Sequence, residues 1–214
     1  MRLPFHRRVA IAFVAPHRER CGAFVERVME NDFFAGYFDE VYASLRAIAR
    51  DRIVEVVALL RQVRSERRRV FIFGNGGSAA TSSHFACDLI KLTRQQGLPD
   101  FRVIALTDNM PVFSAYANDH GYDTVFAAPL KSLAEPGDVA IGISASGRSA
   151  NVLRGMDVAQ ELGLFRVGFA GYDGGVLKDK VDVCLIAPGK HASQIEDAHH
   201  VLQHAICRAI IETE

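Results

Sequence analysis

Five short apolar runs, each separated from the next by a longer segment with a helical pattern, constrain the fold of this 214-residue chain more than any other feature. The runs are rich in Val, Ile and Phe, which is typical of buried strands, and they lie at residues 70–73, 103–106, 139–143, 167–170 and 183–186. Helices are expected near residues 78–95, 122–133, 149–162 and 192–212. This alternation predicts βαβ units with right-handed crossovers, and therefore an α/β fold with a doubly wound, five-stranded parallel sheet flanked by helices.

The N-terminal third of the chain has a different pattern. Between residues 21 and 64, apolar side chains recur at three- and four-residue steps, which predicts two helices broken near residues 31–36. We therefore divide the chain into residues 1–64, an N-terminal segment with helices that pack on the core or at a subunit interface, and residues 65–214, one structural domain.

Neither targeting nor membrane insertion is expected. The apolar run at residues 9–15 is short for a signal sequence and no A-x-A cleavage site follows it. Runs of about 18 apolar residues, the length that a membrane span needs, do not occur. The four cysteines, Cys21, Cys87, Cys184 and Cys207, form no CxxC pair, as is typical of reduced thiols, and a cytoplasmic location is expected.

The charge balance excludes partners that bind through a strong global field. Lys and Arg together number 25, as do Asp and Glu, so the formal net charge is zero. Nucleic acids and membrane surfaces usually require an excess of basic residues. Any partner must therefore be recognised locally.

The first loop that could carry chemistry follows the strand expected at residues 70–73. It reads Gly74-Asn75-Gly76-Gly77-Ser78, in which glycines allow tight turns and Ser78 can cap the next helix. A helix N-terminus with free amides favours an anion. The loop is neither a dinucleotide fingerprint nor a Walker loop, because G-x-G-x-x-G and GK[ST] are both absent. A glycine turn alone fits a purely structural role equally well.

A second loop, Ser144-Ala145-Ser146-Gly147-Arg148-Ser149, runs from a strand directly into a helix. Three hydroxyls and several backbone amides meet at that helix start. Donors and helix dipole together stabilise phosphate there. One serine would be an ordinary cap, but three around a glycine predict a phosphate site.

Two helices carry a constellation of imidazoles and carboxylates. His84 and Asp88 are four positions apart, and Glu196, His200 and His204 repeat the same step near the C-terminus. Such groups could bind zinc or transfer protons. Spacing alone also fits histidines that cap the core or lie on the surface.

These elements, in this order, resemble the phosphoheptose isomerases. These enzymes carry a sugar-phosphate-binding (SIS) domain of flavodoxin-like fold and interconvert sedoheptulose 7-phosphate and D-glycero-D-manno-heptose 7-phosphate. The resemblance covers nearly the whole chain from about residue 24. It rests on GNGGSAATSSHFACDL, ALTDNMPVFSAYANDHGYDTVF, GISASGRSANVLRGMDVAQELG, GYDGG at residues 171–175, and IEDAHHVLQHAICRAIIE.

The resemblance implies a role for each matching position, and an enediolate mechanism with zinc assistance in a cytoplasmic homotetramer. The acid/base pair would be Asp88 and His204. The zinc ligands would be His84, Asp88, Glu196 and His204. Sugar contacts would come from Asn75, Gly76, Gly77, Asn118 and Asp119, with Ser78 beside them, and the phosphate would be held by Ser144, Ala145, Ser146 and Ser149. Asp88 and Glu196 would also contact the substrate.

Three positions depart from the family pattern. The family has glutamate where this chain has Asp88, glutamine where it has Glu196, and arginine where it has Leu92. These differences leave open an isomerase for another sugar phosphate, or a non-catalytic SIS protein such as the regulator that binds the bacterial replication initiator. His204 favours an enzyme, since that regulator lacks histidine there. An enzyme for amino-sugar phosphates would need a nitrogen-handling site, and the sequence contains no such motif.

Overall fold

The computed structural model describes residues 32–213, and the chain from Glu40 onward forms one compact unit. The apolar run at residues 9–15, Cys21 and the start of the first predicted helix lie outside the described residues.

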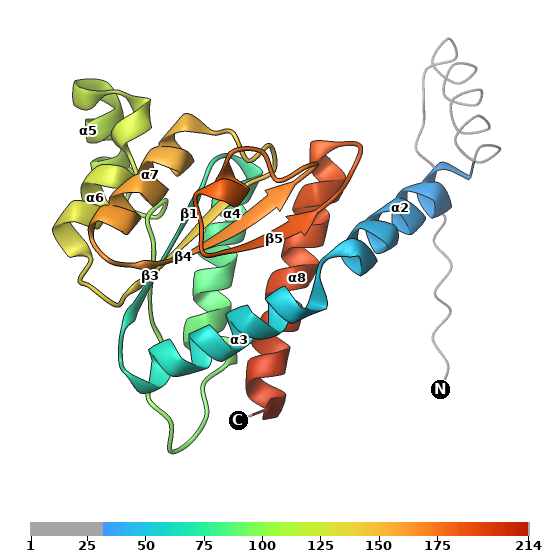
Figure 1. Cartoon of the computed structure of the whole chain (residues 1–214), viewed down its shortest axis with the longest axis horizontal. Coiled ribbons are helices and arrows are strands. Elements are labelled where there is room, and N and C mark those ends of the chain that lie inside the picture. The colour runs from blue at the N-terminus through green and yellow to red at the C-terminus, as the bar shows by residue number, and fades with distance from the viewer. Residues whose placement is uncertain (1–31, 214) are drawn as a thin grey trace, which may run out of the picture. The chain divides into compact units, whose positions relative to one another are not determined.

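The sheet has five parallel strands in the order β2-β1-β3-β4-β5 (Figure 1). Their bounds are Arg69–Gly74 (β1), Arg102–Ala105 (β2), Val139–Ser144 (β3), Phe165–Gly171 (β4) and Val183–Ala187 (β5). Each predicted strand is confirmed within two residues, and so is the doubly wound α/β fold. Because the strand order changes direction between β1 and β3, ligands are expected beyond the carboxyl ends of these two strands.

Helices cover both faces of the sheet. Alternate side chains of a strand point to opposite faces. Val70 and Ile72 therefore share a core with α3, α4 and α8, whereas Phe71 and Phe73 share one with α6 and α7. The bounds are α2 Phe33–Ala47, α3 Arg50–Ser65, α4 Gly77–Cys87, α5 Met110–His120, α6 Ala127–Leu133, α7 Ala150–Glu161 and α8 Ala192–Thr213, with short helices η1 Asp88–Leu92, η2 Tyr122–Thr124 and η3 Leu177–Asp179.

The predicted break near residues 31–36 lies at the start of the described residues, where Asp32 has a φ of +43° and α2 begins at Phe33. A second break, which was not predicted, lies at Ile48 and Ala49. The side chain of Ile48 is 3% exposed in the core, and Ala49 adopts an extended conformation. The break at Ile48 and Ala49 therefore coincides with the burial of an isoleucine, and no glycine or proline in the sequence marks it.

Helix α5 was not predicted at all. None of its residues is fully buried, and its half-buried apolar side chains, Phe113, Tyr116 and Ala117, form only a short stripe that packs on the core. The local signals for its start are nevertheless present. The side chain of Asn109 accepts a hydrogen bond from the Val112 amide at 3.2 Å, and Pro111 stands in the first turn.

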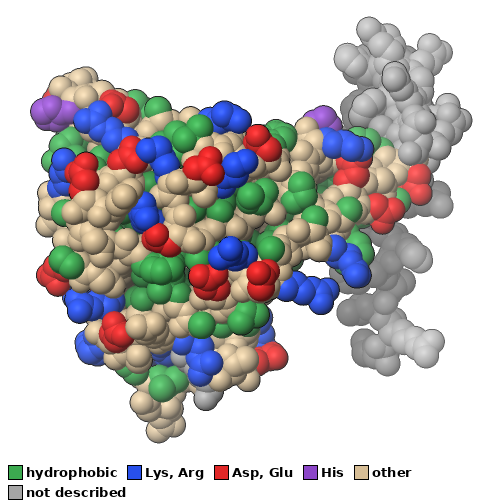
Figure 2. Space-filling model, viewed as in Figure 1, with side chains coloured by type: hydrophobic (Ala, Val, Ile, Leu, Met, Phe, Trp, Pro, Cys, Tyr) green, Lys and Arg blue, Asp and Glu red, His purple; other side chains and the backbone are tan. Residues whose placement is uncertain are grey.

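The surface seen in Figure 2 carries Lys, Arg, Asp and Glu side chains intermixed, with no large area of one sign. This agrees with the zero formal net charge. Cys87, Cys184 and Cys207, the cysteines in the described part of the chain, are free thiols. No helix within residues 32–213 is long and apolar enough to cross a membrane.

Candidate functional site

The serine loop after β3 presents its hydroxyls to one another. Ser144 Oγ lies 3.0 Å from Ser149 Oγ and 3.5 Å from Ser146 Oγ. Ser149 occupies the N-cap position of α7, but its side chain makes no capping hydrogen bond to the described chain. Its hydroxyl therefore bonds another hydroxyl of the same loop instead of the helix, and it can still contact a ligand. Three clustered hydroxyls at a helix start form an arrangement that suits the oxygens of a phosphate.

The glycine loop after β1 runs close to the serine loop because it lacks side chains. A Cβ on Gly74 would lie 2.7 Å from the carbonyl oxygen of Ile143, so no other residue fits there. Gly76 has a φ of +54°, which favours glycine and turns the chain into α4. The first turn of α4 thereby comes to lie next to the end of β3.

A pocket of about 240 Å³ lies between these two loops. It brings together seven of the predicted substrate-binding residues and three others that the predictions did not include. The lining residues are Asn75, Ser78, Ser144, Ala145, Ser146, Ser149 and Glu196, with Ile143, Tyr172 and Ala192 in addition. The pocket lies at the switch point of the sheet, where the fold class predicts a ligand. We call it the serine pocket.

The GYDGG segment forms a wall of the serine pocket. It is joined to the serine loop by backbone hydrogen bonds from Gly171 to Ala145 and from Val176 to Gly147, at 2.9 and 3.0 Å. Tyr172 lines the pocket with a φ of +50°, a left-handed conformation that is costly for a residue with a side chain. Sequence reasoning missed this residue, although the turn residues around it were a signal.

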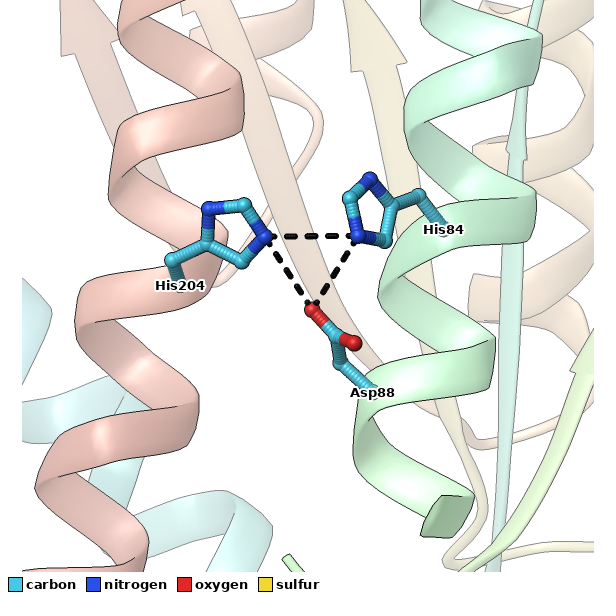
Figure 3. Close-up of side chains that lie close together, drawn as sticks. All are labelled: His84, Asp88 and His204. Carbon is cyan, nitrogen blue, oxygen red and sulfur yellow. Dashed lines mark hydrogen bonds and ion pairs between the residues drawn. The ribbon is translucent and has the colours of Figure 1, made fainter. Parts of the chain in front are cut away.

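Helices α4 and α8 bring three predicted metal ligands together (Figure 3). His84 Nε2 and His204 Nε2 are 3.3 Å apart, and they lie 3.5 and 3.3 Å from Asp88 Oδ2. Asp88 begins the π-helical turn η1, which follows α4 directly. Such turns are frequent at functional sites. Despite its shorter side chain, Asp88 reaches both imidazoles.

The chemistry of this cluster follows from its donor atoms. Asp88 Oδ2 is buried and accepts no hydrogen bond from any described residue, while the two histidine side chains are 44% and 49% exposed. A buried carboxylate oxygen with two imidazole nitrogens can transfer a proton or hold a cation.

Glu196 lies outside this cluster. Its carboxylate lines the serine pocket and stands over the first turn of α4, so a Cβ at Gly77 would overlap it. Gly77 is therefore the position that lets the carboxylate approach the backbone. The structure places Glu196 toward the predicted phosphate end of the site.

His200 links α8 to α4 through a chain of hydrogen bonds. Its Nε2 lies 3.1 Å from Thr81 Oγ1, which donates to the carbonyl oxygen of Gly77 at 3.2 Å, and its Nδ1 lies 3.4 Å from Gln203 Nε2. Burial of the ring, assisted by His84 and His204, lowers the pKa of His200. His200 thereby links the two helices that carry the cluster.

The remaining predicted residues are not at the pocket wall. Asn118 and Asp119 are exposed at the end of α5, where the Asn118 amide donates to the Asp119 carboxylate at 2.7 Å. A larger hollow of about 530 Å³ lies at the amino ends of the strands, near Phe165 and Arg166. It contains none of the predicted site residues and is at the edge of the sheet where ligands are not expected.

Three comparisons with known proteins identify relatives of this chain. Residues 36–171 match the SIS domain family. The chain is 37% identical over 191 residues to the phosphoheptose isomerase of Roseiflexus sp. (strain RS-1), covering 86% of this chain and 95% of that protein. It is 35% identical to the phosphoheptose isomerase of Aquifex aeolicus (strain VF5), covering 82% and 87%. The structure of phosphoheptose isomerase GmhA from Neisseria gonorrhoeae has a TM-score of 0.78 and 31% identity, covering 88% of this chain and 99% of that one.

Proposed function

This chain belongs to the phosphoheptose isomerase family of SIS-domain proteins, and we propose that it converts sedoheptulose 7-phosphate to D-glycero-D-manno-heptose 7-phosphate. The observation that carries the proposal is the placement of the His84–Asp88–His204 cluster along the same two helices that begin at the serine pocket. A phosphate site and an acid/base site on one pair of helices are what a sugar-phosphate isomerase requires.

The length of α4 between the serine pocket and the cluster accommodates an extended sugar phosphate. Ser78 and His84 are six residues apart on α4, which corresponds to about 9 Å along the helix axis. An open heptose chain ending in a phosphate ester spans roughly 9 Å, given carbon–carbon bonds of about 1.5 Å. A phosphate in the serine pocket would therefore leave C1 and C2 near the cluster.

In the proposed reaction, Asp88 and His204 act as the acid/base pair. Starting from the ketose, one removes a proton from C1 and the other protonates the carbonyl oxygen at C2, which gives an enediol. A proton is then delivered to C2 and the proton on O1 is lost, which gives the aldose. Their reactive atoms, Oδ2 and Nε2, lie 3.3 Å apart, so both can reach adjacent carbons of one substrate. The serine hydroxyls and the amides that open α7 hold the phosphate during this transfer.

We further propose that the cluster holds zinc. A tetrahedral ion with bonds of about 2.0 Å has its ligand atoms about 3.3 Å apart, close to the separations of 3.3–3.5 Å among the three side chains. The unpartnered Asp88 oxygen also fits a ligand role. A bound zinc ion would act as a Lewis acid toward the oxygens at C1 and C2. Because the ion and the proton compete for the same lone pairs on Oδ2 and Nε2, each side chain would transfer a proton only while it is not bonded to the ion. Glu196 would be the fourth ligand by resemblance, and the homotetramer and cytoplasmic location also remain predictions.

Metal analysis of the purified protein, followed by an assay with sedoheptulose 7-phosphate, tests the proposal. We expect about one zinc per chain, and we expect His204→Ala to abolish turnover while sedoheptulose 7-phosphate still binds. His120→Ala, at an exposed histidine on α5, is the matched control and should keep full activity. A chain with neither zinc nor turnover would instead be a non-catalytic sugar-phosphate-binding protein, and comparable turnover in His204→Ala would refute the assignment of His204.

A further inference from the structure

The side chain of Asn75, in the glycine loop, is held by two residues from distant parts of the chain. Its amide exchanges two hydrogen bonds with the Asn151 amide, both at 2.8 Å. It also accepts a hydrogen bond from the hydroxyl of Tyr122 at 2.9 Å. Asn151 lies in the first turn of α7 and is 3% exposed, whereas Tyr122 lies on η2.

The orientation of both amides follows from a backbone group that can only donate. The Val152 N–H donates to Asn151 Oδ1 at 2.9 Å, so that atom must be the oxygen. Asn151 Nδ2 then donates to Asn75 Oδ1, and Asn75 Nδ2 donates back to Asn151 Oδ1. The Tyr122 hydroxyl must donate, because Asn75 Oδ1 has no hydrogen to give.

This arrangement leaves the Asn75 side chain with one unused hydrogen-bonding group, an N–H of its amide. Its oxygen already accepts two hydrogen bonds, one for each lone pair, and one of its two N–H groups is in use. The second N–H meets no acceptor among residues 32–213. Asn75 can therefore serve a ligand only as a donor.

Asn75 also lies at a boundary. It lines the serine pocket and, on another side, a mostly apolar pocket of about 230 Å³ that includes Met110, Phe113 and Tyr122. A ligand in either pocket would therefore lie next to this donor.

We infer that Asn151 and Tyr122 are positioning residues that fix the Asn75 amide as a donor to an acceptor oxygen of the substrate. The inference rests on the proposed function for the identity of that substrate. The acceptor is a phosphate, carbonyl or hydroxyl oxygen. A protonated amine has no lone pair and would leave the N–H unpaired, so the same arrangement disfavours an amino-sugar phosphate at this contact.

Surrounding contacts hold the two positioning residues in place. The Tyr122 ring packs edge-on against Phe113, with ring centroids 5.6 Å apart, and this contact does not depend on the hydroxyl. The next residue, Asp123, forms an ion pair with Arg154 of α7, which ties η2 to the helix that carries Asn151. Tyr122→Phe therefore removes one hydrogen bond and keeps the packing.

A double-mutant cycle tests the inference through affinity rather than turnover. Calorimetry gives the apparent Kd of sedoheptulose 7-phosphate for the unaltered chain, Tyr122→Phe, Asn75→Ala and the double variant. We expect Tyr122→Phe to raise Kd about three- to tenfold, the effect of one lost hydrogen bond, and to have almost no further effect once Asn75 is alanine. Asn151→Ala, which removes the donor without adding a charge, should behave in the same way and should raise KM more than it lowers kcat.

Tyr116→Phe on α5 is the control, because its ring packs on His120 and its hydroxyl makes no hydrogen bond to Asn75. Inorganic phosphate is titrated in parallel, so that the coupling is measured even if the heptose phosphate is not the substrate. The inference would be overturned if Tyr122→Phe changed Kd by the same factor in the unaltered chain and in Asn75→Ala, for both sedoheptulose 7-phosphate and inorganic phosphate. Lack of turnover by the unaltered chain would refute the proposed function and leave the coupling result standing.

Discussion

Acidification should destabilise this protein through one buried histidine, His199. The ring is fully buried, and its Nε2 lies 3.1 Å from the Ala170 carbonyl oxygen at the end of β4. Since a carbonyl can only accept, Nε2 carries the proton, and Nδ1 is left without a partner in the described structure. Protonation would place a charge and an unpaired N–H in the core.

The size of the effect follows from the pKa. Burial lowers the pKa of His199 from 6.5 to about 4; the hydrogen bond to Ala170 partly opposes this shift, and His200 adds to it. Each pKa unit corresponds to about 1.4 kcal/mol, so the full difference amounts to about 3 kcal/mol. Because the folded pKa is the lower one, the unfolded chain binds the proton first. The stabilisation is therefore fully present above pH 6.5 and is lost as the pH falls toward 4.

Urea unfolding of the metal-free protein at pH 7.5, 5.5 and 4.5 measures this loss. His199 alone should lower the free energy of unfolding by about 1.4 kcal/mol at pH 5.5 and by more than 2 kcal/mol at pH 4.5. His199→Gln can keep a donor to Ala170 but cannot titrate. On acidification, its free energy of unfolding should therefore fall by less than that of the unaltered chain, and the difference should equal these amounts.

His120→Gln is the matched control, because it removes an exposed histidine by the same substitution. The difference between the two variants isolates the buried ring. Identical pH dependence of the unaltered chain and His199→Gln would refute the reasoning. A pH dependence of the unfolding free energy that is reduced equally in His199→Gln and His120→Gln would also refute it.

Three further predictions concern the site. Gly147→Ala should destabilise the fold by about 1–3 kcal/mol in urea and weaken binding of inorganic phosphate, because its φ is +60° and a Cβ would overlap the carbonyl of Gly174; unchanged stability would contradict this. Glu196→Gln should tighten phosphate binding by removing a negative charge from the serine pocket, and calorimetry should show the gain shrinking in 1 M salt; weaker binding would point to a direct role for the carboxylate. Chelation should abolish turnover and added zinc should restore it, with Asp88→Asn retaining less zinc by metal analysis; full activity after chelation would exclude the proposed metal role.

Much of the site could be predicted from local sequence. The glycine and serine loops can be recognised in the sequence because each follows an apolar strand and begins a helix. The i, i+4 step that places His84 and Asp88 together is a property of one helix. Such features depend on residues a few positions apart.

The choice among the C-terminal histidines could not be predicted in this way. His199, His200 and His204 all lie on α8, yet one is buried against β4, one holds α4, and one joins Asp88. The role of each histidine depends on how α8 is rotated about its axis against the sheet, and the packing of the apolar side chains sets that rotation. The hydrogen bonds around Asn75 could not be predicted for the same reason, because they join the glycine loop to residues 47 and 76 positions away along the chain.

The sequence by itself therefore determined the architecture and the types of chemical group, since strand and helix periods and loop glycines are local properties of the backbone. Tertiary structure alone decided which groups meet. It placed His84 beside His204 across 120 residues, Glu196 in the serine pocket, and Asn118 and Asp119 away from its wall. Contacts of this kind form only when two helices pack on the same sheet, because their energy comes from burying apolar faces that lie far apart along the chain.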